Sequence, residues 1–143
     1  MALGRRKLLL VGGGVVCAHA IGCGGGDTVT LPRDIAAGNA SALALNTLRP
    51  VSGAAAAIGR DAGGIYAMSL VCTHQGCDIA ASGSVSFNLI ECGCHGSQFN
   101  AQGNVLRGPA AAPLPHLLVS ADAAGALTIH GDSPVASNVR LSI

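Results

Sequence analysis

Two short boxes decide how this sequence is interpreted: Cys72-Thr73-His74-Gln75-Gly76-Cys77 and Cys92-Gly93-Cys94-His95-Gly96-Ser97. Each box offers cysteine and histidine side chains together. Soft thiolates bind iron–sulfur clusters or zinc, and imidazole binds both, so the residue types alone leave two metals open. The spacing and the surrounding sequence have to decide between an iron–sulfur cluster and zinc.

The paired boxes resemble those of Rieske proteins of the cytochrome bc and bf type, in which Cys-Thr-His-x-Gly-Cys is followed by Cys-x-Cys-His-Gly-Ser. The similarity runs from Ile65 to the last apolar run of the chain. It includes three further stretches: Phe99-Asn100-Ala101-Gln102-Gly103, Arg107-Gly108-Pro109 and Pro113-Leu114-Pro115.

This resemblance implies one [2Fe-2S] cluster per chain. Cys72 and Cys92 would bind one iron through their thiolates, and His74 and His95 would bind the other through imidazole nitrogens. Two neutral imidazoles in place of two thiolates leave the oxidised cluster neutral, which makes the addition of an electron easier.

The resemblance also assigns roles around the cluster. Cys77 and Cys94 would form a disulfide that ties the two ligand loops together in a subdomain with little apolar core, and this bond requires an oxidising compartment. The hydroxyl of Ser97 would donate a hydrogen bond to a bridging sulfide and raise the reduction potential.

Three residues depart from the usual pattern of the family. Phe99 stands where high-potential members have Tyr, so we expect a potential below the top of the class. Gly93 replaces the usual Pro, and we expect a more permissive, slightly less rigid loop. Gln75 stands where quinol-oxidising members usually have Leu, which weakens the case for quinol as the direct donor.

Outside the boxes, short apolar runs are separated by Gly, Asn, Asp and Pro, a rhythm that predicts an all-β domain. The turns at 60–64 and 122–125 predict hairpins. The resemblance implies the Rieske fold, an antiparallel β-sandwich with a small cluster-binding subdomain of two ligand loops. The predicted apolar runs are 54–58, 65–71, 85–90, 117–120 and 126–130.

The N-terminal residues predict export. Arg5, Arg6 and Lys7 precede the apolar stretch 8–16, and the opening resembles a twin-arginine signal, which exports proteins already folded around their cofactors. We expect an export signal over 1–22, a flexible linker over 23–41 and the domain over 42–143, with its cluster-binding part at about 70–116.

Ala20-Ile21-Gly22-Cys23 resembles a lipobox, so the thiol of Cys23 is the expected lipid anchor. Cleavage after Ala20 and an uncleaved signal anchor are the alternatives. The expected location is the periplasmic side of the cytoplasmic membrane.

Charge excludes nucleic acid as a partner. From Asp27 onward, five Arg face seven Asp or Glu, a net charge of −2, so no basic surface remains for a phosphate backbone. His116 and His130 lie outside both boxes and are assigned no role.

We therefore expect an electron-transfer subunit of an oxidoreductase complex, rather than an enzyme by itself, and no catalytic residue. The first candidate is the iron–sulfur subunit of a membrane-bound quinol–cytochrome c reductase-type complex, with cytochrome b and quinol on one side and a cytochrome c-type acceptor on the other. The alternative is a subunit or carrier that serves another redox subunit of a periplasmic oxidoreductase resembling arsenite oxidase. A soluble oxygenase-type ferredoxin fits less well, because such ferredoxins lack the disulfide cysteines and an export signal. A structural zinc domain is the remote alternative.

Overall fold

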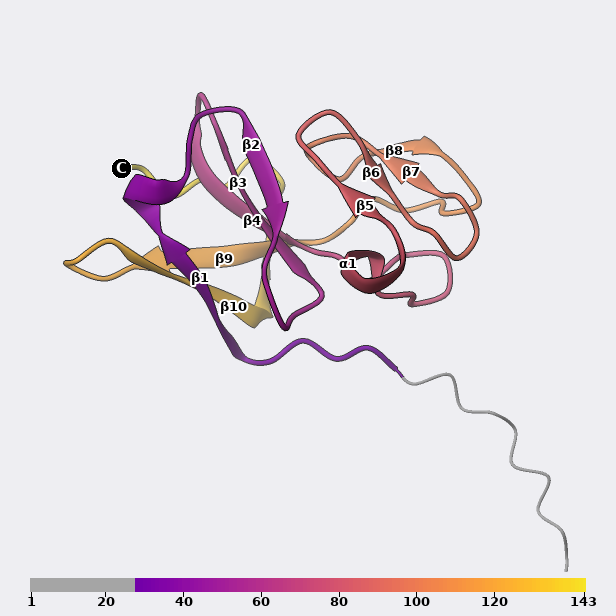
Figure 1. Cartoon of the computed structure of the whole chain (residues 1–143), viewed down its shortest axis with the longest axis horizontal. Helices are drawn as coiled ribbons and strands as arrows, with labels where there is room; N and C mark the ends of the chain where they lie inside the picture. The colour runs from indigo at the N-terminus through magenta and orange to yellow at the C-terminus, as the bar shows by residue number, and fades with distance from the viewer. Residues whose placement is uncertain (1–27) are drawn as a thin grey trace, which may run out of the picture.

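A computed structural model describes residues 28–143 and contains two antiparallel sheets with one-turn helices between strands (Figure 1). The predicted signal at 1–22 and the predicted lipid anchor Cys23 lie outside the described residues. The elements are β1 (Asp34–Asn39), η1 (Ala40–Ala42), β2 (Thr47–Pro50), β3 (Ala56–Asp61), β4 (Gly64–Ser69), α1 (Ile79–Ser82), β5 (Ser84–Val85), β6 (Ile90–Glu91), β7 (Gln98–Phe99), β8 (Val105–Arg107), β9 (His116–Ala121) and β10 (Ala126–Val135).

The larger sheet has six strands in the order β1-β10-β9-β4-β3-β2. Its two predicted hairpins are confirmed: β3 and β4 turn where Asp61 pairs with Gly64, and β9 and β10 turn at Asp122, whose N–H donates to the carbonyl oxygen of Ala126. The predicted all-β, antiparallel fold is confirmed as well.

β3 and β4 are buried on both faces, which explains their unbroken apolar sequences. Alternate residues of a strand point to opposite faces. Ile65 and Ala67 belong to a core enclosed by the larger sheet, whereas Tyr66 and Met68 belong to a second core that faces the smaller sheet. The central strands therefore carry the smaller sheet on the face opposite the first core.

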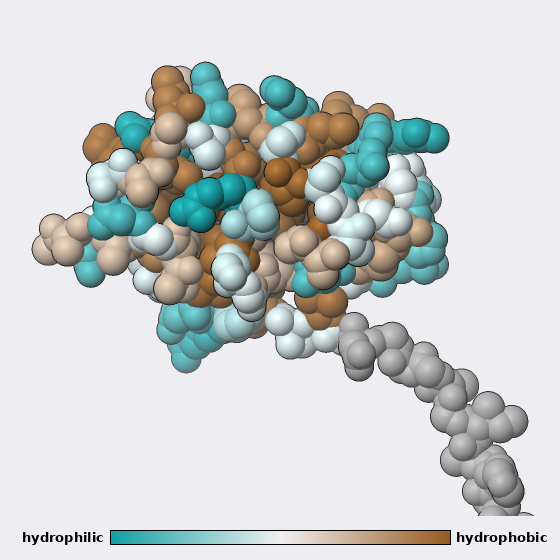
Figure 2. Space-filling view, in the orientation of Figure 1, coloured by the Kyte–Doolittle hydropathy of each residue, from teal (hydrophilic) through white to brown (hydrophobic). Residues whose placement is uncertain are grey.

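The smaller sheet has four short strands in the order β5-β6-β7-β8 and lies beside the larger one, with α1 between them (Figure 1). Apolar side chains reach the surface near the middle of the face shown in Figure 2, where the two sheets meet. The predicted single run 85–90 is wrong, because Ser86 starts a turn. Its hydroxyl accepts from the N–H of Leu89, and its own N–H donates to the carbonyl of Leu89, so the run splits into β5 and β6.

The boundary between linker and domain also needs correction. The predicted linker over 23–41 includes β1, which pairs with β10 through Asp34 and His130, and through Ile35 and Ile129. Its buried positions, Ile35 and Ala37, alternate with exposed ones, but small residues give this pattern a weak signal. In the described residues, no helix is long and apolar enough to cross a membrane.

Candidate metal centre

The two boxes fold into matching loops, each at the tip of a pair of strands or bridge residues. In the first loop the N–H of Cys72 donates to the carbonyl of Cys77, and the N–H of Gly76 donates back to the carbonyl of Cys72, both at 2.8 Å. The second loop repeats this pattern: Cys92 donates to Ser97 and Gly96 donates to Cys92.

Glycine is required at the fifth position of both loops because the backbone there turns left-handed. Gly76 and Gly96 both have a φ of 77°, a conformation that side chains disfavour. The two loops therefore share the same backbone conformation at this position, which the sequence spacing alone did not reveal.

The structure leaves Cys72 and Cys92 as buried, free thiols, with 3% and 1% exposure. Burial raises the pKa of the Cys72 thiol, and the neighbouring Cys92 thiol adds to the rise. Hydrogen bonds from the His74 backbone and the Ser97 side chain oppose it. Two buried thiols side by side destabilise each other's ionised form, and a bound cation would remove this penalty.

The two histidines of the boxes lie together. The ring centroids of His74 and His95 are 4.8 Å apart in an edge-to-face arrangement. Nδ1 of His74 is buried and has no hydrogen-bond partner, a costly state for a polar atom unless it binds something. His95 is exposed, so one edge of the site reaches the surface.

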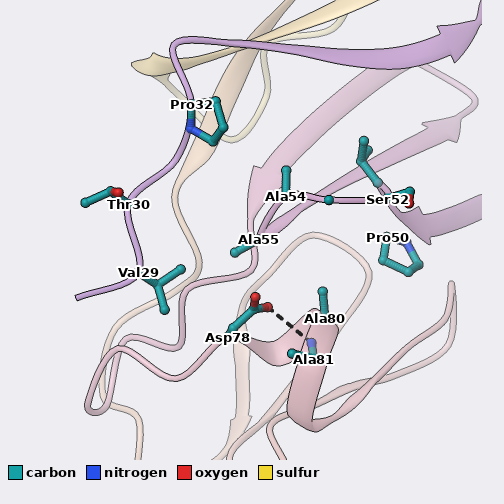
Figure 3. A pocket seen from close by; sticks show the side chains of 12 residues that line it. Val29, Thr30, Pro32, Pro50, Ser52, Ala54, Ala55, Asp78, Ala80 and Ala81 are labelled. Atoms are coloured by element: carbon teal, nitrogen blue, oxygen red, sulfur yellow. Dashed lines mark hydrogen bonds between the residues drawn. The ribbon is translucent and has the colours of Figure 1, made fainter. Parts of the chain in front are cut away.

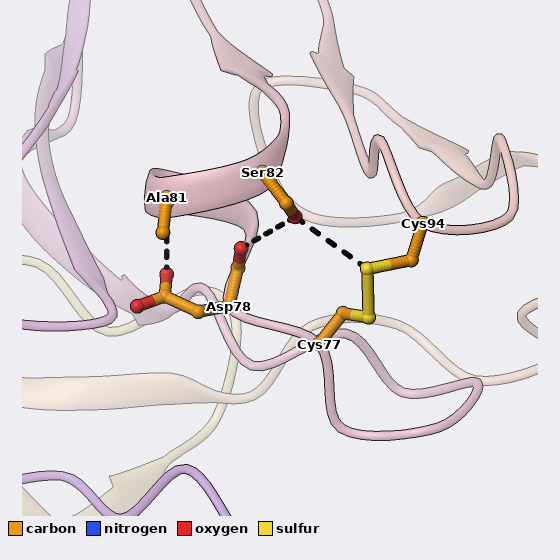
Figure 4. The surroundings of a disulfide bond; sticks show 5 residues. All are labelled: Cys77, Asp78, Ala81, Ser82 and Cys94. Carbon is orange, nitrogen blue, oxygen red and sulfur yellow. Dashed lines mark hydrogen bonds between the residues drawn. A yellow bond between two sulfur atoms is a disulfide. The ribbon is translucent and has the colours of Figure 1, made fainter. Parts of the chain in front are cut away.

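Cys77 and Cys94 are joined by a disulfide with an S–S distance of 2.03 Å (Figure 4). The sulfur of Cys92 lies within 4.8 Å of both disulfide sulfurs. These three sulfurs do not form a metal site together, because two of them are consumed by the disulfide. The bond therefore connects the two loops beside the free thiols.

Ser97 and Phe99 border the thiols from within the core, and both are fully buried. The hydroxyl oxygen of Ser97 accepts the N–H of Ala110 at 2.9 Å, so its own hydrogen remains available to donate. Phe99 packs in the same apolar cluster as Cys72 and Cys92, with no hydroxyl to offer either thiolate. Gln75 is exposed at the end of the first loop.

Sequence reasoning missed a polar network that fixes the smaller sheet on the larger one. The hydroxyl of Tyr66 donates to the carbonyl of Ala101 at 2.9 Å, and His116 shares a 2.9 Å hydrogen bond with the carbonyl of Gln102. Both carbonyls belong to the turn between β7 and β8. The rings of Tyr66 and His116 stack with centroids 5.8 Å apart.

Arg140 closes this network from the C-terminal segment. Its guanidinium lies 4.4 Å from the centroid of the Tyr66 ring and bonds the carboxylate of Asp61 at 2.8 Å. This hydrogen bond lowers the pKa of Asp61. Burial raises the pKa of Tyr66 to about 12 and lowers that of His116. Only contacts between distant segments create this network, so no local motif could reveal it.

His130 forms a second hydrogen-bonded chain on the larger sheet. Its Nδ1 lies 2.9 Å from a carboxylate oxygen of Asp34, and its Nε2 lies 2.8 Å from the hydroxyl of Ser120. A catalytic triad has the same order of atoms, but there the aspartate is buried, whereas the Asp34 side chain is 64% exposed. The three residues lie on the adjacent strands β1, β10 and β9. We therefore assign them a structural role, in which their hydrogen bonds hold these strands in register.

A groove of about 660 Å³ lies between the N-terminal segment of the described chain, the β2–β3 connection and α1 (Figure 3). Small residues line most of it, and its one carboxylate, Asp78, is engaged as the N-cap of α1 with the N–H of Ala81. The groove is not lined by the free thiols or the paired histidines, so it is not the chemical site.

Fold and site together define an all-β domain in which two matching loops hold two buried free thiols and two neighbouring imidazoles. The family model described as "Rieske [2Fe-2S] domain" matches residues 33–118. The chain belongs to the Rieske [2Fe-2S] domain family, and the family implies a [2Fe-2S] cluster.

Among curated proteins, the cytochrome b6-f complex iron-sulfur subunit of Synechococcus sp. (strain JA-2-3B'a(2-13)) is 46% identical over 77 residues, which are 54% of this chain and 36% of that protein. The chloroplastic cytochrome b6-f complex iron-sulfur subunit of Triticum aestivum is 49% identical over 57 residues, 40% of this chain and 24% of that protein. The chain thus aligns with about a third or less of the length of these relatives.

Among solved structures, a chain in the complex of reduced oxygenase and oxidized ferredoxin in carbazole 1,9a-dioxygenase superposes with a TM-score of 0.50 at 26% identity. The match covers 73% of this chain and 98% of that one. The fold is therefore shared between proteins of different redox systems, and fold alone does not select the partner.

Proposed function

We propose that the chain is a one-electron carrier in which Cys72 and Cys92 bind one iron of the cluster and His74 and His95 bind the other. The observation that carries the proposal is the convergence of the matching loops: two buried free thiols, two neighbouring imidazoles and a buried Nδ1 of His74 without a partner. This donor set fits a cluster with two thiolate and two imidazole ligands. The bound cluster supplies the site that accepts and releases the electron.

The chain's own residues control that site in three ways. The disulfide and the loop hydrogen bonds hold the ligands in place, which reduces the rearrangement that accompanies electron transfer. The Ser97 hydroxyl, positioned by Ala110, donates toward the sulfurs and favours the reduced state. The exposed ring of His95 brings the electron to the surface.

Spectroscopy of one variant tests the ligand set. In His95→Cys an added thiolate brings negative charge to the iron that gains the electron, so we expect either loss of the cluster or a strongly lowered potential. His130→Cys is the matched control, because His130 bonds Asp34 and Ser120 away from the loops. An unaltered electron paramagnetic resonance spectrum and potential in His95→Cys would remove His95 from the ligand set.

For the partner, we propose a quinol–cytochrome c reductase-type complex with a cytochrome b. Support comes from the names of the curated relatives, which are subunits of cytochrome b6-f complexes. The exposed Gln75 favours the second candidate, a carrier for another periplasmic oxidoreductase resembling arsenite oxidase. Purification of the tagged chain from gently solubilised native membranes separates the two: co-purified b-type haem supports the first, and a redox partner without it supports the second.

The proposed location is the periplasmic face of the cytoplasmic membrane, with Cys23 as the lipid anchor. The basic and apolar residues before Cys23 and the lipobox-like sequence support it. Cys23→Ser should release the domain into the soluble periplasmic fraction. Continued membrane association of that variant would favour an uncleaved signal anchor instead.

A further inference from the structure

The backbones before β5 and after β6 touch so closely that neither of two glycines could carry a side chain. A Cβ atom on Gly93 would lie 1.7 Å from the carbonyl oxygen of Ser82. A Cβ atom on Gly83 would lie 1.9 Å from the carbonyl oxygen of Glu91. Real Cβ contacts are essentially never shorter than 3.0 Å, and here the obstructing atoms are backbone.

The local fold creates this contact. Asp78, the residue after Cys77, caps α1, and Gly83 ends it by donating its N–H to the carbonyl of Ile79 at 2.9 Å. Ser84 then pairs with Glu91, the residue before Cys92. The single helical turn is thus set between the two ligand loops, with its C-terminal end against the second.

The same turn contacts the disulfide. The Ser82 hydroxyl donates to the carbonyl of Asp78 at 2.6 Å and lies 3.7 Å from the sulfur of Cys94 (Figure 4). One end of α1 is therefore continuous with Cys77, and the other end meets the backbone beside Cys94.

We propose that the Gly83–Gly93 contact positions the second ligand loop against α1, and that Gly93 is a positioning residue for Cys92, Cys94 and His95. The proposal deepens the cluster site proposed above and rests on it for the ligand roles only. On this proposal, the second ligand loop is no less rigid with Gly93 than it would be with the proline that is usual in the family. The ring of a proline would occupy the space taken by the Ser82 carbonyl, so in this chain the contact with α1 replaces the stiffness of proline.

The other two glycines of the boxes, Gly76 and Gly96, have free space where a side chain would lie. A Cβ atom added to Gly76 or Gly96 would meet no heavy atom within 4 Å, and both glycines are required for their positive φ. Gly83, with a φ of −131°, adopts a backbone open to any residue. Space, and not backbone conformation, is what excludes a side chain there.

Gly93→Ala and Gly93→Pro test the proposal, with Gly108→Ala as the matched control, because a Cβ at Gly108 would meet nothing closer than 3.8 Å. The measurements are the fraction of protein with the Cys77–Cys94 disulfide, by mass spectrometry, and the iron content and electron paramagnetic resonance g values after reduction. We expect about a tenfold loss of cluster in both Gly93 variants, as overpacking against backbone predicts, with shifted g values in the remainder. The control should match the wild type.

Wild-type g values and disulfide fraction in Gly93→Ala would overturn the proposal, even if its melting temperature fell, and so would equal damage in Gly108→Ala. Should the Gly93 variants not fold, hydrogen exchange on the wild-type protein decides. The amides of 82–84 and 92–95 should exchange as one unit, and rates that differ more than about tenfold would contradict the contact. If the wild type held no cluster, the ligand proposal would fail, while the disulfide fraction and hydrogen exchange would still test the contact.

Discussion

The hydroxyl of Thr73 donates a 2.6 Å hydrogen bond to the carbonyl oxygen of Ala112. Thr73 lies in the first ligand loop, and Ala112 lies in the proline loop, which we define as residues 109–115. The N–H of Ala110 in the same loop donates to Ser97 of the second ligand loop. The proline loop is therefore bonded to both ligand loops.

Thr73→Val should loosen the attachment of the proline loop to the first ligand loop, because it removes the hydroxyl and keeps the shape of the side chain. A hydrogen bond of this kind contributes about 1 kcal/mol, so we expect several-fold faster loss of iron to a chelator. Thr73→Ser retains the hydroxyl and should lose iron at nearly the wild-type rate. Equal rates in all three proteins would show that the bond does not retain the cluster.

Cys77→Ser should affect retention of the cluster more than its potential. The disulfide connects the two loops, and loss of such a bond in a small domain costs about 2–5 kcal/mol of folding free energy. The comparison is iron content against midpoint potential in the purified variant. The double variant Cys77→Ser/Cys94→Ser should resemble the single one, since it removes the same bond without leaving a free thiol. A large shift in potential with full iron content would contradict the proposal that the disulfide chiefly retains the cluster.

Phe99→Tyr should raise the midpoint potential. Phe99 is fully buried in the same apolar core as Cys72 and Cys92, and a hydroxyl added there that donates to a thiolate would stabilise the added electron. For one electron, each tenfold change in the equilibrium is about 59 mV. Phe87→Tyr is the matched control, because the partly buried Phe87 lies at the edge of this apolar core. A lower or unchanged potential in Phe99→Tyr would show that the new hydroxyl does not reach the sulfurs.

The stability of the domain should fall in mild acid, in part through His116. Burial lowers the pKa of His116 below its ordinary value of 6.5, and its Nδ1 is buried without a partner. The unfolded chain therefore binds this proton more readily, so stability is fully present above the unfolded pKa and declines as the pH falls below about 6.5. Chemical denaturation at several pH values from 8 to 5 measures the slope of the free energy of unfolding against pH.

His116→Gln provides the comparison, since glutamine keeps a donor for the carbonyl of Gln102 but does not titrate. The free energy of unfolding of the variant should depend less on pH over this range than that of the wild type. Identical slopes would assign the acid sensitivity to other groups.

The sequence predicted what local residues determine. The two boxes are contiguous, so their ligands, the Cys77–Cys94 pairing and the hairpins at 60–64 and 122–125 could be proposed from spacing and resemblance. The structure places the six cysteines and histidines of the boxes in two matching loops and joins the two cysteines that the resemblance pairs.

What sequence reasoning missed depends on long-range contacts. β1 is a strand because Ile35 and Ala37 meet the core through β10, and the small residues of this segment signal that only weakly. Gly93 looked permissive because its obstacle, the carbonyl of Ser82, belongs to another segment. The stacking of Tyr66, His116 and Arg140 likewise joins three distant parts of the chain.

The most direct test of the central claim is a metal and acid-labile sulfide analysis of the native protein purified without added metal. We expect two irons and two sulfides per chain, as the [2Fe-2S] family implies, and no zinc at the site. Zinc bound without iron or acid-labile sulfide would contradict it and make the paired loops a structural zinc site.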